Sequence, residues 1–128
     1  MSIYSLYQIP MVREAYDYVN KVGWAKAFEK YPIVEARQNL QCKGSEAMES
    51  RFAEYFVKVC DIKCDSPEEA FRIHNFQEED SMIRYAPQHT MSVGDVLVGP
   101  EGDVLMCDSF GWQKLEGQTI GGSEAAMA

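Results

Sequence analysis

The sequence predicts an α+β domain: a small antiparallel sheet of three or four strands, two or three helices on one face, and a β-hairpin near the C-terminus. Segments of strand length that are rich in β-branched and aromatic residues lie near both ends of the chain, at 3–9 and 96–107. Between them, apolar residues recur at helical spacing behind helix-capping residues. The 128 residues, 46% of them hydrophobic, suffice for one core. We expect a single domain over 1–120 and a flexible tail at 121–128.

The N-terminal third is predicted to contain a strand, a long helix and an edge strand. Residues 3–9 favour a strand, which Pro10 ends. Apolar residues at helical spacing predict one helix over 12–30, with Gly23 as a point where it can bend. Residues 31–36 are expected to form a short strand, which Pro32 would confine to an edge of the sheet. A polar connector is expected at 37–44.

Two further helices are predicted in the middle of the chain. The first has Ser45 as its N-cap and a single apolar face that comprises Met48, Phe52, Tyr55, Phe56 and Val59. The second starts at Ser66, where the serine can cap, Pro67 fits the first turn and Glu69 can complete a capping box. This helix is expected to end near Asn75. Residues 77–90 lack periodicity and are expected to form a solvated loop.

The C-terminal hairpin is predicted from two apolar runs, at 96–98 and 104–106, on either side of Gly99-Pro100-Glu101-Gly102. Proline fixes φ and glycine can take a positive φ, so the intervening segment predicts a turn. Apolar residues lie on both faces of each run. The hairpin is therefore expected in the interior of the sheet, with both of its faces covered.

The hairpin and its flanks resemble a known family. Ser92-Val93-Gly94-Asp95-Val96, followed after a turn by Asp108-Ser109-Phe110-Gly111 and the aromatic Trp112, is similar to the C-terminal signature of YodL-like domains. Looser similarity covers the tyrosine-rich segment 3–9 and the segment 68–75. The resemblance implies a small α+β domain found in phage and plasmid accessory proteins and in large mobile-element polyproteins, and it implies no enzymatic activity and no cofactor.

Charge is unevenly distributed along the chain, and its formal total is −8. Residues 1–44 hold six basic and four acidic residues, residues 45–80 hold four and ten, and residues 81–128 hold two and six. An acidic surface repels phosphates, so direct nucleic-acid binding is disfavoured and a protein partner with a basic surface is favoured. Alternatively, the charge serves solubility alone. No apolar run of membrane-spanning length and no signal-peptide pattern occurs, so we expect a protein of the bacterial host cytoplasm.

No arrangement of residues in the sequence predicts catalysis. The cysteines lack the close pair spacing of a zinc site, so we expect no metal, no other cofactor, and four reduced thiols at Cys42, Cys60, Cys64 and Cys107. Cys60 is expected at a helix end in the core and Cys64 exposed in a loop. Ser109 lacks the preceding glycine of a nucleophile elbow. Cys107 with His89 is a poor nucleophilic pair, because burial would make the thiol inert.

The signature is expected to have a structural role, which is assigned to Ser92, Gly94, Asp95, Asp108 and Gly111. Asp95 follows a glycine at the start of a strand, where a carboxylate commonly accepts backbone hydrogen bonds and fixes a turn. Gly94 is expected to have a positive φ or a close backbone neighbour. The alternative is a small enzyme that uses Asp95 or His89 for proton transfer, which would need a pocket.

The sequence favours a non-enzymatic interaction module of phage or mobile-element origin that binds a host or phage protein. One form of this function is inhibition of a nucleic-acid-binding defence or transcription protein, because carboxylates can occupy a groove built for phosphates. Candidate partner-binding residues are Glu68, Glu69, Glu78, Glu79, Asp80, Trp24 and Trp112. The rival from another class is a nucleic-acid-binding accessory domain whose basic residues are Arg13, Lys21, Lys26, Lys30 and Arg37.

Because the cysteines are expected to be free thiols, reductant should leave the melting temperature of the protein unchanged. A domain of this size can form its core without a cross-link. Thermal unfolding followed with and without reductant checks this expectation. A fall of many degrees on reduction would reveal a stabilising disulfide.

Overall fold

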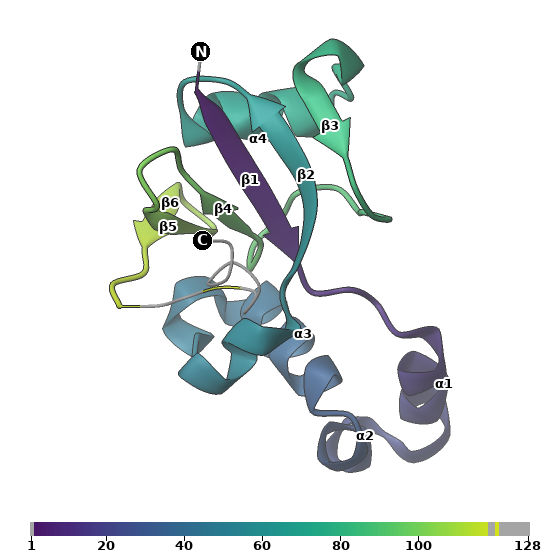
Figure 1. The fold of residues 1–128 in the computed structure, drawn as a ribbon. Helices are drawn as coiled ribbons and strands as arrows, with labels where there is room; N and C mark the ends of the chain where they lie inside the picture. The colour runs from purple at the N-terminus through teal and green to yellow at the C-terminus, as the bar shows by residue number, and fades with distance from the viewer. Residues whose placement is uncertain (1, 118–119, 121–128) are drawn as a thin grey trace.

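The protein has an α+β fold in a computed structural model that describes residues 2–117 and residue 120 (Figure 1). The predicted tail at 121–128 lies outside the described residues. The helical elements are α1 Arg13–Val22, α2 Trp24–Lys30, α3 Pro32–Lys43 and α4 Pro67–Asn75, with short 3₁₀ helices η1 Gly44–Ala47, η2 Ser50–Tyr55 and η3 Glu79–Ser81. The strands are β1 Ile3–Gln8, β2 Val57–Lys63, β3 Met82–Arg84, β4 Val96–Val98, β5 Val104–Cys107 and β6 Trp112–Lys114.

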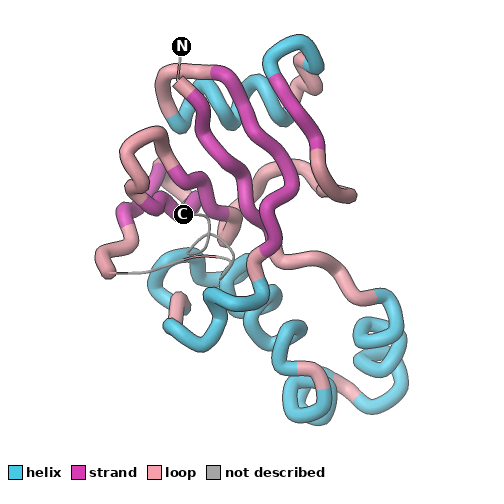
Figure 2. The backbone as a smooth tube through the Cα atoms, viewed as in Figure 1, coloured by secondary structure: helices cyan, strands magenta, loops and turns pink. Residues whose placement is uncertain are grey.

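The six strands form one antiparallel sheet in the order β3-β2-β1-β4-β5-β6 (Figure 2). The predicted number of three or four strands was therefore too low. The hairpin formed by β4 and β5 pairs with β1 on one side and β6 on the other, which confirms its predicted place in the sheet interior. Strands β3 and β6 are the two edges.

The two faces of the sheet carry separate apolar clusters, and different helices cover them. Leu97 of β4 packs in one cluster with Ala70 and Ile73 of α4. Its neighbour Val96, which strand alternation turns to the opposite face, packs in the other cluster with Leu40 of α3. The helices thus divide between the two faces, whereas the sequence predicted them on one.

The predictions for residues 31–44 were wrong about the type of structure. Instead of an edge strand and a connector, these residues form α3, which begins at Pro32 and ends at Lys43. Proline is favoured at the first position of a helix, because its φ is already helical and its missing N–H would have no helical partner. The same residue that suggested an edge strand therefore starts a helix.

The helix predicted to start at Ser45 is also absent, and η1, η2 and the strand β2 take its place. Phe52, Phe56 and Val59 are buried as expected, but in different elements. Cys60 lies within β2 rather than at a helix end, and Cys64 is buried rather than exposed. Burial raises the pKa of both thiols to about 11.

Other predicted boundaries are close to those observed. Gly23, with φ +90°, separates α1 from α2 where the sequence predicted a possible bend in one helix. At the start of α4, Ser66 Oγ accepts a hydrogen bond from Glu69 N at 3.1 Å. The Glu69 carboxylate accepts from Asp65 N at 2.9 Å rather than from Ser66 N, one residue from the capping-box geometry. The segment predicted as a loop at 77–90 contains η3 and the edge strand β3.

Replacing Gly94 with alanine should destabilise the fold by more than about 2 kcal/mol, because a positive φ and a backbone clash act together. Gly94 has φ +93°, and a Cβ there would stand 2.9 Å from the carbonyl carbon of Leu40 in α3. Gly111 provides the matched control, since its φ is +82° and a Cβ would meet nothing within 4 Å. Urea midpoints of Gly94→Ala and Gly111→Ala measure the difference. Equal losses of stability in the two variants would show that the close approach of Gly94 to α3 adds nothing to the cost of the substitution.

Candidate functional site

Asp95 is a buried carboxylate, only 5% exposed, at the start of β4. Its Oδ2 accepts hydrogen bonds from Ser92 N at 2.9 Å and from Gln8 Nε2 at 3.0 Å. Its backbone N–H donates to Ser92 O at 3.1 Å, and its carbonyl accepts from Cys107 N at 2.9 Å. The side chain therefore fixes the turn before β4, which is the structural role that the sequence suggested.

Burial raises the pKa of Asp95 to about 7. The Ser92 N–H, the Gln8 amide and the charge of Arg37 each favour the ionised form, but together they do not offset the cost of burying the charge. A carboxyl group that titrates near neutrality inside a protein is a common property of functional sites, although structural networks also produce it.

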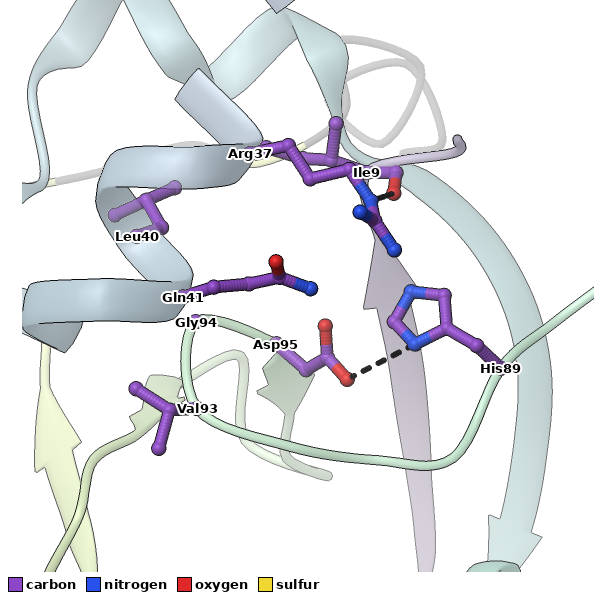
Figure 3. Close-up of a pocket in the computed structure, with 8 residues that line it drawn as sticks. All are labelled: Ile9, Arg37, Leu40, Gln41, His89, Val93, Gly94 and Asp95. Atoms are coloured by element: carbon purple, nitrogen blue, oxygen red, sulfur yellow. Dashed lines mark hydrogen bonds and ion pairs between the residues drawn. The ribbon is translucent and has the colours of Figure 1, made fainter. Parts of the chain in front are cut away.

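A small pocket lies beside Asp95 (Figure 3), lined by Ile9, Arg37, Leu40, Gln41, His89, Val93, Gly94 and Asp95. His89 Nδ1 stands 4.0 Å from Asp95 Oδ2, so the structure brings together the two residues of the enzyme alternative. The cavity holds only about 10 Å³, which is close to the room needed by one water molecule. A substrate larger than water does not fit in it.

His89 has one ring nitrogen with a partner and one without. Its Nδ1 lies 3.0 Å from Thr90 O, and donation to that carbonyl would place the proton of a neutral ring on Nδ1. Its Nε2 is buried and has no hydrogen-bond partner within the described residues. Burial lowers the pKa of His89, which favours the neutral ring. A neutral imidazole beside Asp95 does not compensate a buried carboxylate charge.

Two amide side chains hold the segment that carries His89. Gln8 Nε2 donates to His89 O at 2.8 Å, and Gln8 Oε1 accepts from His89 N at 3.1 Å. Asn75 bonds both backbone groups of Met91 in the same way. Its Nδ2 donates to Met91 O at 3.1 Å, and its Oδ1 accepts from Met91 N at 2.8 Å. Each amide therefore pairs with both backbone groups of one residue, as a neighbouring strand would. Sequence reasoning missed Gln8, whose signal was a polar residue at the end of an apolar strand.

An apolar groove adjoins this small pocket and shares His89 with it. Its volume is about 420 Å³. The lining residues come from the end of β1 and the following loop, from β2, and from the loop after β3: Gln8, Pro10, Met11, Val57, Val59, Ala86, Pro87, Gln88 and His89. These segments are far apart in the sequence, so no sequence pattern indicated the groove.

The acidic candidates lie at α4 and at η3, and several are engaged in ion pairs. Glu78 pairs with Arg72, and Glu79 accepts from both Arg84 Nε at 2.9 Å and Arg84 Nη2 at 2.6 Å. The hydrogen bond from Arg84 lowers the pKa of Glu79. Asp80 is exposed and makes no ion pair within the described part of the chain. Glu68 is exposed at the start of α4, where Glu69 is half-buried.

The two tryptophans belong to α2 and β6, which lie apart in the fold (Figure 1). Trp24 begins α2, is exposed, and meets the ring of Tyr16 edge to face at 6.2 Å. Trp112, in β6, is half-buried against the cluster that contains Leu97. They do not form a common aromatic patch, so the structure places the predicted aromatic candidates on different surfaces.

The remaining signature residues connect β5 and β6 to the helices. Asp108 accepts hydrogen bonds from Ser45 N and Ser45 Oγ, both at 2.7 Å, which ties the end of β5 to η1. Asp108 N donates to Gly111 O at 2.9 Å across the turn between β5 and β6. Gly111 has a positive φ in that turn. Ser45, predicted as a helix cap, therefore caps no α-helix and binds Asp108.

The basic residues proposed for nucleic-acid binding do not all face solvent as free charges. Arg37 donates to Ile9 O and to Tyr16 Oη, both at 3.1 Å. Lys30 Nζ lies over the ring of Tyr18, 4.6 Å from its centre. Arg13, Lys21 and Lys26 are exposed, but the break at Gly23 divides them between α1 and α2. A single basic helix face is therefore not formed.

Comparison with protein-family models, with curated proteins and with solved structures finds no match for this chain. Within residues 2–117 and 120, no group of three or more histidine, cysteine, aspartate or glutamate side chains is arranged to hold a metal ion. No helix in that part of the chain is both long enough and apolar enough to cross a membrane. The site must therefore be interpreted from its own geometry.

Asp95 should make stability fall as the pH rises towards neutrality. The unfolded carboxyl loses its proton near its ordinary pKa of 3.8, whereas the folded one keeps it up to about 7. Between these two pKa values the folded state therefore binds one more proton than the unfolded state. The free energy of unfolding falls there by roughly 1 kcal/mol per pH unit. The loss is complete above the folded pKa. Asp95→Asn removes this contribution, so urea unfolding should show the variant gaining about 2 kcal/mol relative to the parent between pH 5 and pH 8.

Asp61 supplies the matched control for that measurement. Burial opposes its ionisation, but hydrogen bonds from Ser5, Tyr85 and Lys58 outweigh burial and lower its pKa. Its stabilisation is present above the ordinary pKa and is lost only in more acidic solution. Asp61→Asn should therefore cost the same stability at pH 5 and pH 8. If Asp95→Asn also changes stability by the same amount at pH 5 and pH 8, Asp95 does not titrate near neutrality.

Proposed function

We propose that the protein is a non-enzymatic interaction module that binds a partner protein with a basic surface. The observation that carries the proposal is the segment 76–85, which leads into and past the edge strand β3 and in which large exposed apolar side chains and exposed carboxylates follow one another along the chain. Phe76 is 75% exposed, and Ile83 and Tyr85 are about half exposed. Exposed apolar side chains grouped with charged ones are characteristic of interaction sites, where aromatic residues often supply most of the binding energy.

The charge of this surface favours a basic partner. The carboxylates of Glu68, Glu69, Glu78, Glu79 and Asp80 outnumber the two arginines that pair with them, Arg72 and Arg84. The ion pairs with Arg72 and Arg84 also restrict the side chains of Glu78 and Glu79. Fixed carboxylates lose less conformational entropy on binding than mobile ones. Electrostatic attraction of this kind raises the association rate and weakens with added salt.

The position of β3 at the edge of the sheet adds a second means of recognition. β3 pairs with β2 on one side, and it has no neighbouring strand on the other within the described residues. An edge strand can pair its backbone with an extended segment of another protein. Three residues make a short edge, so we expect side chains rather than backbone pairing to dominate the affinity.

We prefer this function to an enzymatic one because the pocket beside Asp95 is too small for a substrate, because the hydrogen bonds of Asp95 explain its burial structurally, and because none of the described Lys, Arg, Asp or Glu residues lines the larger groove beside His89. The resemblance of the hairpin segment to YodL-like domains supports a role in a phage or another mobile element. Inhibition of a nucleic-acid-binding host protein is the form of this function that the acidic surface supports, since carboxylates can replace phosphates in a basic groove.

The double variant Phe76→Ser with Asp80→Lys should lose the partner. Reversing Glu78 and Glu79 is a less clean test, because lysines there would face Arg72 and Arg84. Capture from bacterial host lysate at about 0.1 M salt, where screening is moderate, should fall at least about tenfold. The matched control is Phe110→Ser with Glu101→Lys, which makes the same changes at exposed positions of the β4–β5 and β5–β6 turns. Undiminished capture by a folded Phe76→Ser, Asp80→Lys protein would exclude this surface.

A further inference from the structure

We propose that the apolar groove beside His89 is a binding site for an uncharged, apolar small molecule of the size of one or two aromatic rings. This site is separate from the protein-binding surface proposed at β3. Its volume of about 420 Å³ lies within the range of roughly 300–1,000 Å³ that is typical of small-molecule sites. Three segments of the chain build it, which is the usual construction of a ligand site.

The walls of the groove are held in place by hydrogen bonds that do not depend on a ligand. Gln88 Nε2 donates to Val59 O at 3.2 Å and to Ala86 O at 3.3 Å, and so bridges β2 and the loop after β3. Gln88 Oε1 also contacts His74 Nε2. Gln8 holds the opposite wall through both backbone groups of His89. A preformed site of this kind loses little conformational entropy on binding.

Apart from His89 Nε2, which is buried without a partner in the described residues, the polar side-chain groups of the groove are already hydrogen-bonded. Gln8 uses both amide protons, on His89 O and Asp95 Oδ2, and Gln88 uses both of its own on backbone carbonyls. No lysine, arginine, aspartate or glutamate lines the groove. A charged group entering the groove would lose hydration without gaining an oppositely charged partner, and the carboxyl of Asp95 behind Gln8 further disfavours an anion. The lining therefore selects an uncharged ligand.

The rim of the groove supplies apolar surface that a ligand would remove from water. Met11 is 58% exposed and Val57 is 43% exposed, although both are large apolar residues. Their burial by a ligand is favourable in proportion to the area covered. Methionine is also a flexible side chain that adapts to aromatic rings. The rim and the apolar walls together favour a flat aromatic ligand.

Titration of isotope-labelled protein with indole tests the proposal by NMR. Indole should produce saturable amide shifts at Val57, Val59, Ala86 and His89. Tryptamine and indole-3-acetate, which add a positive and a negative charge to the same ring system, should bind at least about tenfold more weakly. Absence of saturable shifts with indole, or equal affinity for the anion or the cation, would overturn the assignment.

Two variants locate the site. Ala86→Leu places a larger side chain in the groove and should abolish the indole shifts, with folding checked by the remainder of the spectrum. Met11→Ala removes rim surface at an exposed position, where folding should be unaffected, and should weaken binding about threefold to tenfold. Phe110→Ala, at a 97% exposed position on the β5–β6 turn, is the matched control and should bind as the parent does. Indole affinity that is unchanged in Met11→Ala would refute the site even if Ala86→Leu does not fold.

Discussion

The hydrogen bond from Gln8 to Asp95 is the interaction on which much of the structure depends. It joins the end of β1, at the centre of the sheet, to the turn that starts β4. The same amide holds both backbone groups of His89, so one side chain positions the turn and the segment leading to it. A buried glutamine and a buried carboxyl would each be costly alone, but together they satisfy one another.

The turn that this interaction positions brings the sheet and α3 into contact. Gly94 lies against the backbone of Leu40, an approach that leaves no room for a side chain. The carbonyl of Asp95 and the N–H of Gly94 both pair with Cys107, so the turn is also bonded to β5. The glycine, the carboxyl and the glutamine therefore act as one unit, and the small pocket beside them is a consequence of how tightly they pack.

Side-chain hydrogen bonds of this kind also account for the surfaces proposed to bind other molecules. After β3, the chain crosses the ends of β1 and β2 in a segment that is held by Gln8, Asn75 and Gln88. This crossing forms one wall of the apolar groove. It also ends the pairing of β3 with β2 after a short ladder, so that β3 remains a short edge with exposed apolar residues. The acidic η3 segment precedes that edge. The proposed protein-binding surface and the groove thus both follow from the path that the chain takes before and after β3.

The sequence by itself determined the α+β class, the hairpin, the start of α4 and the position of Gly23 as a weak point in the first helical segment, because each depends on interactions between residues close together in the chain. The Ser66 cap, the turn at 99–102 and the positive φ of Gly94 are local properties of this kind. Residues 31–59 were predicted less well. There, Pro32 suits both an edge strand and the first turn of a helix, and the apolar spacing of Phe52, Phe56 and Val59 fits a helix as well as buried strand and 3₁₀ positions.

Only the tertiary structure decided the candidate sites. The bonds of Gln8 and Asn75 to residues far away in the sequence, and the meeting of Met11, Val57 and Ala86 in one groove, arise from strand order, which no local pattern encodes. Asp95 shows the division clearly. Its neighbours Ser92 and Gly94 indicated a carboxylate that fixes a turn, but its pKa near 7 depends on burial beneath Gln8, α3 and His89, since the cost of ionisation is set by everything that excludes water around the group.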